Sequence, residues 1–246
     1  MHRRWRIPVV LGFVAVFVTG GPIGPRGHSR PADHTATSTW GIDPAGFTTE
    51  IDNRFFPLRT GTRRVYEGTG EGGGAVRTVV EVTSVTRQVM GVSCVVVRDT
   101  MRVDGTVVED SFRWYAQDRE GNVWYFGENT NRYVDGRVVS AAENWEAGAG
   151  GAQPSLVMKA DARVGDRYRQ EYNPGSEENV AEVLSLHERA IGWLGTFDRV
   201  LMTSESTPHA PGRVRHAYYA PGVGLILEVT VAGGSGSTEL VELTHA

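Results

Sequence analysis

Short runs of β-branched and aromatic residues, separated by turn signals at close intervals, dominate the chain from Val76 to its end. The pairs Asp104-Gly105 and Asp135-Gly136 each stand between two apolar runs, as the two-residue turns of β-hairpins do. The sequence therefore predicts an all-β fold, an antiparallel meander of about eleven strands with little helix, bent into a half-closed or closed barrel-like sheet. The expected strands are residues 76–86, 92–99, 107–117, 122–128, 136–140, 166–172, 179–186, 197–206, 213–220, 224–231 and 237–244.

One segment fits this pattern less clearly. Residues 177–190, EENVAEVLSLHERA, could form a helix, but their Val and Leu positions fit a strand about as well. Both alternatives stay open from the sequence. No internal repeat of fixed period is visible.

The N-terminus has the pattern of an export signal. Basic residues at 2–6 precede an apolar run of about a dozen residues, Ile7–Val18. That run is shorter than the roughly 20 residues of a stable membrane-spanning helix. We expect residues 1–20 to be a signal peptide, with an uncleaved anchor as the alternative. The protein would then be exported, and either secreted or associated with the cell envelope.

The next segment differs in composition. Residues 21–45 are rich in Pro, Gly, Ser and Thr and show no periodicity, which is typical of a disordered tether. We expect a single β domain over residues 46–246, with its folded part starting near Phe47. The lone cysteine, Cys94, excludes an intramolecular disulfide and lies in the apolar run VSCVVV, which predicts a buried thiol.

The charge of the chain bears on its partners. The net charge is −4, and removal of residues 1–20, which hold three arginines and no acid, changes it to −7. Nucleic acid is therefore not expected as a partner, because phosphate binding needs a clustered basic face. We expect a monomer with no cofactor and with no transmembrane span after processing.

A long segment near residues 141–165 interrupts the rhythm of strands. It is rich in Gly and Ala, carries the single aromatic residue Trp145 and lacks alternation. A loop of this length is uncommon in a compact domain and is often functional. It is a candidate lid over an open face of the sheet, or else a plain surface loop.

The stretch RWYAQDREGNVWYFGENT, residues 113–130, could be a calcium loop or a hairpin. Asp118, Glu120 and Asn122 alternate, but an EF-hand loop needs glycine at position 6 and glutamate at position 12. Here Gly121 falls at position 4, position 12 is Asn129, and helical flanks are missing. The standard metal pattern fails, although a nonstandard calcium site at these three residues remains an alternative.

The hairpin interpretation fits this stretch better. Asp118 to Gly121 suits a type I turn with glycine in the left-handed conformation. Pairing of Asp118 with Asn122 then sets the register of the two strands. The facing pairs are Ala116 with Trp124, Tyr115 with Tyr125, and Trp114 with Phe126. The expected core face carries Phe112, Trp114, Ala116, Trp124 and Phe126, and the other, amphipathic face carries Arg113, Tyr115, Gln117, Val123 and Tyr125.

Several long motifs resemble those of a family of exported bacterial proteins, largely actinobacterial and of unassigned function. The motifs are FTTEIDNRFFPLRTGTRRVYEG (47–68), WYAQDREGNVWYFGE (114–128), WEAGAGGAQP (145–154), VGDRYRQEYNPG (164–175) and YYAPGVGLILE (218–228). The chain departs from the family at Arg54, where members have Pro, and at residues 155–159, where members have Gly-Ile-x-Met-Pro. The last motif is also similar to the end of the half-barrel domains of envelope lipoprotein carriers, which implies a bent sheet but no function.

No motif for a known catalytic chemistry is present. The sequence lacks a G-x-S-x-G elbow, an H-E-x-x-H helix, a phosphate-binding glycine loop and paired cysteines with metal-ligand spacing. An enzyme is therefore the less favoured class. Acids near the long loop, among them Glu128 and Glu146, keep open a secreted carboxylate-dependent hydrolase acting on glycans.

The leading hypothesis is an extracytoplasmic binding protein that holds an apolar or amphipathic ligand, such as a lipid, on a curved, aromatic-rich sheet. Pockets of this kind are mainly apolar with a few polar anchors. A structural or interaction module of the cell envelope, with its core filled by its own side chains, is a further alternative. The candidate ligand-binding residues are Trp124, Phe126, Trp145 and Trp193 as walls, with Arg113 or Arg169 meeting an acidic head group.

Overall fold

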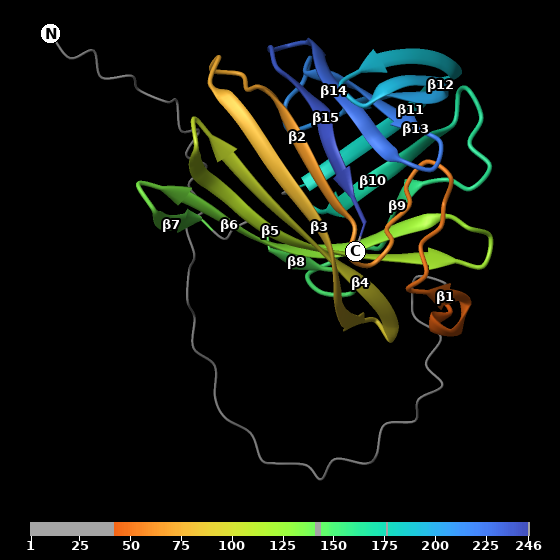
Figure 1. Cartoon of the computed structure of the whole chain (residues 1–246). Coiled ribbons are helices and arrows are strands. Elements are labelled where there is room, and N and C mark those ends of the chain that lie inside the picture. The colour runs from red at the N-terminus through yellow and green to blue at the C-terminus, as the bar shows by residue number, and fades with distance from the viewer. Residues whose placement is uncertain (1–41, 141–143, 176, 246) are drawn as a thin grey trace, which may run out of the picture. The chain divides into compact units, whose positions relative to one another are not determined.

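The computed structural model of the chain describes residues 42–140, 144–175 and 177–245 (Figure 1). The expected signal peptide, residues 1–20, and residues 21–41 of the expected tether lie outside the described residues, as do residues 141–143 of the long segment. Ile42, the first described residue, is buried. Within the described ranges, no helix is long and apolar enough to cross a membrane.

The described residues form fifteen β-strands and one turn of 3-10 helix, η1 (Pro44–Gly46). The strands are β1 (Phe47–Thr48), β2 (Arg63–Thr69), β3 (Ala75–Val89), β4 (Val92–Val103), β5 (Thr106–Asp118), β6 (Val123–Val134), β7 (Arg137–Ser140), β8 (Trp145–Glu146), β9 (Ser155–Met158), β10 (Arg167–Asn173), β11 (Glu177–Gly192), β12 (Gly195–Ser206), β13 (Val214–Ala220), β14 (Gly224–Ala232) and β15 (Ser237–Thr244).

All of these strands join one antiparallel sheet. Twelve follow the order β10-β11-β12-β13-β14-β15-β2-β3-β4-β5-β6-β7, while β1 pairs with β5 and both β8 and β9 pair with β6. The pairing of β15 with β2 places the last strand beside an early one and links the two hairpin series. Among the described residues the outer strands β10 and β7 do not pair with each other, so the sheet is not closed. The predicted all-β antiparallel fold is confirmed in its half-closed form.

The eleven expected strands are present as β3–β7 and β10–β15. Residues 177–190 lie in β11, so the strand alternative holds and the helix alternative is wrong. The sequence did not predict β2, in which only Val65 and Tyr66 are large and apolar between charged neighbours. The long segment near residues 141–165 is not strand-free, because it contains β8 and β9.

The β5–β6 hairpin follows the predicted register near its turn and departs from it farther away. Ala116 faces Trp124 and Tyr115 faces Tyr125, as predicted. The predicted pairing of Trp114 with Phe126 is wrong, because a β-bulge shifts the register there and Trp114 faces Gly127. Gly127 has φ +133°, in a region almost restricted to glycine. The extra residue turns the following side chain of β6 to the other face.

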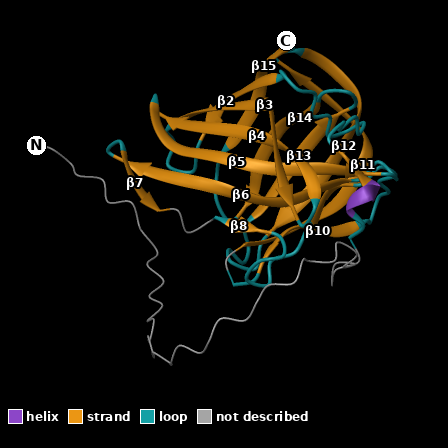
Figure 2. Cartoon of the chain, turned by 90° about the horizontal axis from the view of Figure 1, so that it is seen from below, coloured by secondary structure: helices purple, strands orange, loops and turns teal. Residues whose placement is uncertain are grey.

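Figures 1 and 2 show that the sheet is strongly bent. In Figure 2, β4, β5 and β6 run across the view, while β13 and β14 run in a crossing direction. The larger core cluster includes the buried rings of Trp114, Tyr115 and Phe126. Cys94 is fully buried in this cluster, as predicted, and burial raises the pKa of its thiol to about 12.

The segment Ile51–Leu58 is fixed to the β5–β6 hairpin by buried amide groups. Asn53 donates from Nδ2 to the backbone O of Gly121 at 2.8 Å, and its Oδ1 accepts the N–H of Phe55 at 2.9 Å. Gln117 on β5 accepts the N–H of Asn53 through Oε1 at 3.0 Å. Two motifs that lie far apart in the sequence are thus joined through side-chain amides.

Candidate functional site

A polar cavity of about 510 Å³, open to solvent on one side, lies in the bend of the sheet. We call this space the polar cavity. Strands β5 and β6 line one side, and strands β10, β11, β13 and β14 line the other. The lining residues are Glu109, Arg113, Tyr115, Tyr125, Glu128, Arg132, Val157, Gln170, Glu171, Asn179, Thr207, His209, Arg215 and Glu228.

Strand geometry explains which side chains of β5 and β6 enter the polar cavity. Alternate residues of a strand share one face, so Glu109, Arg113 and Tyr115 point the same way. The bulge at Gly127 then allows both Tyr125 and Glu128 of β6 to lie on this face, opposite Tyr115 and Arg113. The rings of Tyr115 and Tyr125 stack with centroids 5.0 Å apart.

Arg113 is the centre of an ionic network at one side of the polar cavity. Its Nε donates to Oε2 of Glu128 at 2.9 Å, Nη1 pairs with Asp99, and Nη2 lies 3.7 Å from Glu109. Tyr125 donates its hydroxyl to the same Glu128 oxygen at 2.8 Å. One guanidinium therefore pairs with three carboxylates.

Burial disfavours the charged forms of both Arg113 and Asp99, so by itself it lowers the pKa of the arginine and raises the pKa of the aspartate. Burial opposes the charge of Arg113, but the carboxylates of Asp99 and Glu128 outweigh it and hold its pKa well above the ordinary value. Burial raises the pKa of Asp99, and Arg113 offsets this only in part. Among the described residues Oδ1 of Asp99 is buried without a hydrogen-bond partner. The buried site therefore favours the protonated form of Asp99.

A second ionic group lies across the cavity. Arg215 on β13 donates from Nη1 to Glu228 at 3.1 Å, and its Nη2 lies 3.5 Å from Glu205. Glu205 is buried and accepts the hydroxyls of Thr203 and Tyr219, both at 3.1 Å. Burial raises the pKa of Glu205, while Arg215 and these hydroxyls lower it by a smaller amount.

An apolar hollow of about 190 Å³ adjoins the polar cavity. Arg113 and Tyr115 line both spaces, so the two share part of one wall. The remaining lining of the apolar hollow is mainly hydrocarbon and ring, with the polar groups of Arg64 and Asp99 among them. These residues are Phe56, Pro57, Leu58, Arg64, Tyr66, Val80, Val97, Asp99, Gly224 and Leu225.

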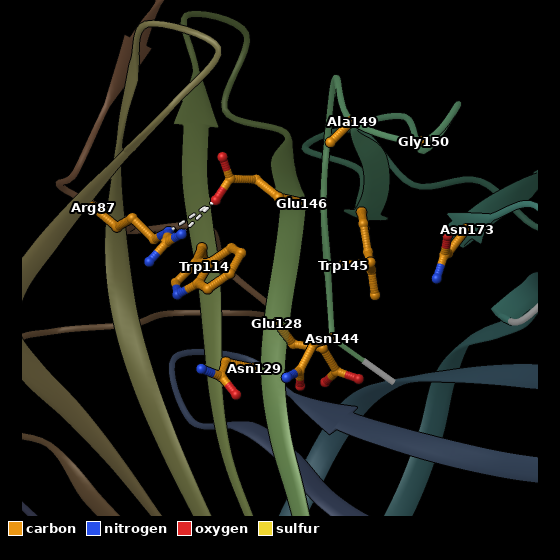
Figure 3. A pocket seen from close by; sticks show the side chains of 10 residues that line it. All are labelled: Arg87, Trp114, Glu128, Asn129, Asn144, Trp145, Glu146, Ala149, Gly150 and Asn173. Carbon is orange, nitrogen blue, oxygen red and sulfur yellow. Dashed lines mark hydrogen bonds and ion pairs between the residues drawn. The ribbon is translucent and has the colours of Figure 1, made fainter. Parts of the chain in front are cut away.

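A groove of about 410 Å³ lies beside Trp145 (Figure 3). We call it the outer groove. The guanidinium of Arg87 lies 4.1 Å from the ring centroid of Trp114 and donates to Oε2 of Glu146 at 2.6 Å. Glu128 lines both the outer groove and the polar cavity. The two spaces therefore meet at one carboxylate.

Of the six residues expected to bind a ligand, the structure places Arg113 in the polar cavity and Trp145 next to it. The ring of Trp145 meets the ring of Tyr125 edge to face, with centroids 5.1 Å apart. Its Nε1 donates to Oε1 of Glu171 at 3.2 Å. Tyr125 and Glu171 both line the polar cavity, so Trp145 supports this wall from behind.

The other four expected residues lie elsewhere. Trp124 and Phe126 point to the opposite face of β6, where both rings pack on Phe47 with centroids 6.3 Å and 5.5 Å apart. Trp193 lies in the β11–β12 turn and is 80% exposed. Arg169 is exposed on β10 and stacks 4.1 Å from the ring centroid of Tyr172. None of the four lines the polar cavity, the apolar hollow or the outer groove.

The three residues of the alternative calcium site form the hairpin turn. Asp118 accepts the N–H and the Nδ2 of Asn122 at 2.8 and 2.9 Å, and the indole N–H of Trp124 at 2.7 Å. Glu120 is exposed. The described part of the chain contains no group of three or more His, Cys, Asp or Glu residues that could hold a metal ion. Asp118 therefore stabilises the hairpin turn through its hydrogen bonds to Asn122 and Trp124.

Several charged residues in or beside the polar cavity carried no recognisable signal in the sequence. Asp99, Glu205, Arg215 and Glu228 lie in strands whose charged positions are typical of a solvated face. Their burial follows only from the bend that brings β13 and β14 opposite β5. The sequence did indicate one part of the site, because the alternation of side chains along the two strands places Arg113, Tyr115 and Tyr125 on a single amphipathic face.

Comparison with known proteins adds little to this site. No family model matches the chain, and no curated protein matches it. A Bacteroides fragilis protein described as exported and as having a YmcC-like fold is 15% identical, with a TM-score of 0.45 over 78% of this chain and 99% of that chain. A Parabacteroides distasonis protein described as a lipoprotein is 16% identical, with a TM-score of 0.44 and the same coverage. These similarities are too low to carry a function across.

Proposed function

We propose that this protein is an extracytoplasmic binding protein for a small amphipathic molecule. The observation that carries the proposal is the pair of adjoining spaces of opposite character that share Arg113 and Tyr115 in their walls. The polar part of the ligand would occupy the polar cavity and a short apolar part, such as the start of a lipid chain, would enter the apolar hollow. Export rests on the N-terminal signal in residues 1–20.

The walls favour a particular kind of polar group. The three arginines of the polar cavity, Arg113, Arg132 and Arg215, are already paired with carboxylates. An anionic head group would have to compete with acids such as Glu109, Glu128 and Glu228. Carboxylate oxygens and tyrosine rings instead suit hydroxyl or amine donors. A head group rich in donors is therefore better supported than the acidic head group expected from the sequence.

Mass spectrometry under native conditions tests the proposal on protein purified from its own host. Leu225 lines the apolar hollow and is half-buried, so Leu225→Trp should fill that space. Val231 lies on the same strand and is 48% exposed, which makes Val231→Trp the matched control. We expect a ligand adduct in the wild type and the control and its loss in Leu225→Trp.

Two results would contradict the proposal. One is a wild-type spectrum without an adduct, together with no uptake of fluorescent amphipathic probes by the purified protein. The other is an adduct that survives equally in Leu225→Trp and in the control. In the second case the bound molecule lies outside the apolar hollow.

A glycan hydrolase is the second candidate, and the observation in its favour is that Glu128 lines both the polar cavity and the outer groove. The contacts of the acids argue against it, because Glu128 is held by Arg113 and Tyr125 and Glu146 is paired with Arg87. General acid catalysis needs a carboxyl group free to transfer its proton. Turnover on a glycan panel, lost in Glu128→Gln, would favour the hydrolase over the binding protein.

A further inference from the structure

Three large apolar side chains lie exposed at the tip of the β11–β12 hairpin. Ile191 is 79% exposed, Trp193 is 80% exposed and Leu194 is 42% exposed, all within four consecutive residues. We call these three residues the apolar tip. Scattered exposed apolar residues are ordinary, but a contiguous group that includes a tryptophan marks a contact surface. We propose that the apolar tip inserts into the interfacial region of a lipid bilayer.

The backbone of the turn is held in place, so the exposure is a fixed feature of the hairpin. Gly192 faces Gly195 across the turn, and Gly195 has φ +114°, which only glycine adopts readily. The N–H of Trp193 donates to Oε1 of Glu239 on β15 at 2.7 Å. A Cβ at Gly192 would overlap that same carboxylate. The anchor to β15 therefore presents the indole outward.

The size of the apolar tip fits a bilayer better than a protein partner. A tryptophan side chain offers about 150–250 Å², so the whole tip offers about half of the ~800 Å² that each partner gives to a standard protein interface. Three side chains on a narrow turn can enter a fluid interface without a complementary surface. Tryptophan is also enriched at membrane–water interfaces, where its ring sits at the level of the head groups.

The charges beside the apolar tip indicate which lipids it would contact. Arg189 and Asp198 form a pair at 3.5 Å, and both side chains are exposed. The chain as a whole has a net charge of −4. Between residues 187 and 199 two arginines, Arg189 and Arg199, are balanced by two acids, Glu188 and Asp198, so the end of the hairpin has no basic excess to select anionic lipids. Insertion then depends on the apolar side chains. Binding to zwitterionic vesicles should match or exceed binding to anionic ones.

The position of the apolar tip is compatible with an accessible polar cavity. Asn179 and Thr207 line that cavity at the other end of the same hairpin. Gly192 comes thirteen positions after Asn179, which corresponds to at most about 43 Å in an extended strand. The apolar tip and the residues that line the cavity therefore belong to opposite ends of the β11–β12 hairpin. This inference does not depend on the nature of the ligand.

Vesicle binding of the chain without its expected signal peptide, residues 1–20, tests the inference, because the apolar run in that segment would itself bind lipid. The tip variant carries Ile191→Ser, Trp193→Ser and Leu194→Ser together, and the matched control carries Val134→Ser, Val138→Ser and Val139→Ser. The three control valines are 54–59% exposed on the β6–β7 hairpin, so both variants replace exposed side chains. With phosphatidylcholine vesicles we expect the tip variant to partition at least tenfold more weakly than the wild type, and the control to partition like the wild type.

A second readout reports on the apolar tip itself, even if another part of the chain also binds vesicles. Lipids with brominated acyl chains quench tryptophans that enter the bilayer. Without residues 1–20 the chain has five tryptophans, so the wild type is compared with Trp193→Phe, which retains the other four. We expect quenching in the wild type that is largely lost in Trp193→Phe.

Three outcomes would overturn the inference. The first is equal partitioning of the wild type and the tip variant, with equal bromine quenching in the wild type and Trp193→Phe. The second is an equal loss of partitioning in the tip variant and the control, which would indicate that any exposed apolar side chain contributes to vesicle binding. The third is a dimer in solution that the tip variant abolishes, which would assign the apolar tip to a second copy of the chain.

Discussion

At the scale of single residues, Gly127 determines which side chains reach the polar cavity. Its φ of +133° is almost exclusive to glycine. A Cβ there would overlap the backbone O of Trp145 and come within 2.8 Å of the Trp114 ring. We expect Gly127→Ala to lower the free energy of unfolding by about 3 kcal/mol or more in urea titrations.

The control for this change is Gly136→Ala in the β6–β7 turn. Gly136 also has a positive φ, +73°, but a Cβ there meets nothing within 4 Å. Its replacement should cost about 1 kcal/mol, the usual penalty for a left-handed alanine. Equal losses in the two variants would show that the close packing around Gly127 contributes nothing.

Glu205 should make stability depend on pH in a direction that follows from its burial. Burial raises its pKa in the folded state, so the folded state favours the protonated form. This unfavourable contribution is absent at pH values below the pKa of Glu205 in the unfolded chain, near 4.3. It is complete at pH values above the pKa of Glu205 in the folded protein. Glu205→Gln imitates the protonated form, so its free energy of unfolding should exceed that of the wild type by up to about 1 kcal/mol at pH 7.

The difference between Glu205→Gln and the wild type should vanish near pH 4, as measured by urea titrations at both pH values. Arg215 keeps Glu228 as a partner in this variant, at 3.1 Å. Glu228→Gln is the control, because it removes that closer partner and should bring no gain at pH 7. A Glu205→Gln protein that is less stable than the wild type at pH 7 would refute this account.

At the scale of elements, the segment Ile51–Leu58 depends on its amide links to the β5–β6 hairpin. Asn53 is 6% exposed and its side chain bonds to the backbone of Gly121 and Phe55. Asn53→Ala leaves these buried backbone groups without partners, so we expect a loss of about 2–4 kcal/mol in the free energy of unfolding. Asn129→Ala on β6, where the side chain is exposed, should change it by less than about 0.5 kcal/mol.

Individual strands and hairpins could be predicted because their signals are local. The period-two patterns and the Asp-Gly turns identified eleven strands and the register next to the β5–β6 turn. The bulge at Gly127 was missed, although a glycine inside a strand is a known sign of one. Strand β2 was missed because only Val65 and Tyr66 in it are large and apolar, and one of its two neighbours, β15, lies far away in the sequence.

At the scale of the whole domain, the sequence could predict a curved sheet but not the polar cavity. Its walls come from β5 and β6 on one side and from β13 and β14 on the other, and no local pattern encodes which strands face each other. Of the expected ligand-binding residues, only Arg113 lines this cavity, since ring-rich positions such as Trp124 and Phe126 are used to pack Phe47. Aromatic content therefore marked the core of the hairpin, while the charged residues marked the cavity.

The order of the sheet also determines where the domain should open first. β2 has ladder partners on both sides and three consecutive buried residues, whereas β7 pairs with β6 alone and is mostly exposed. Amide exchange requires the hydrogen bond to open, and opening is easiest at poorly buried edges. We expect β7 amides to exchange about a hundredfold or more faster than β2 amides in native-state hydrogen exchange. Because β2 pairs with β15, the amides of the last strand should share the slow rates, and fast exchange in β15 would mean that the two ends of the meander are not joined in solution.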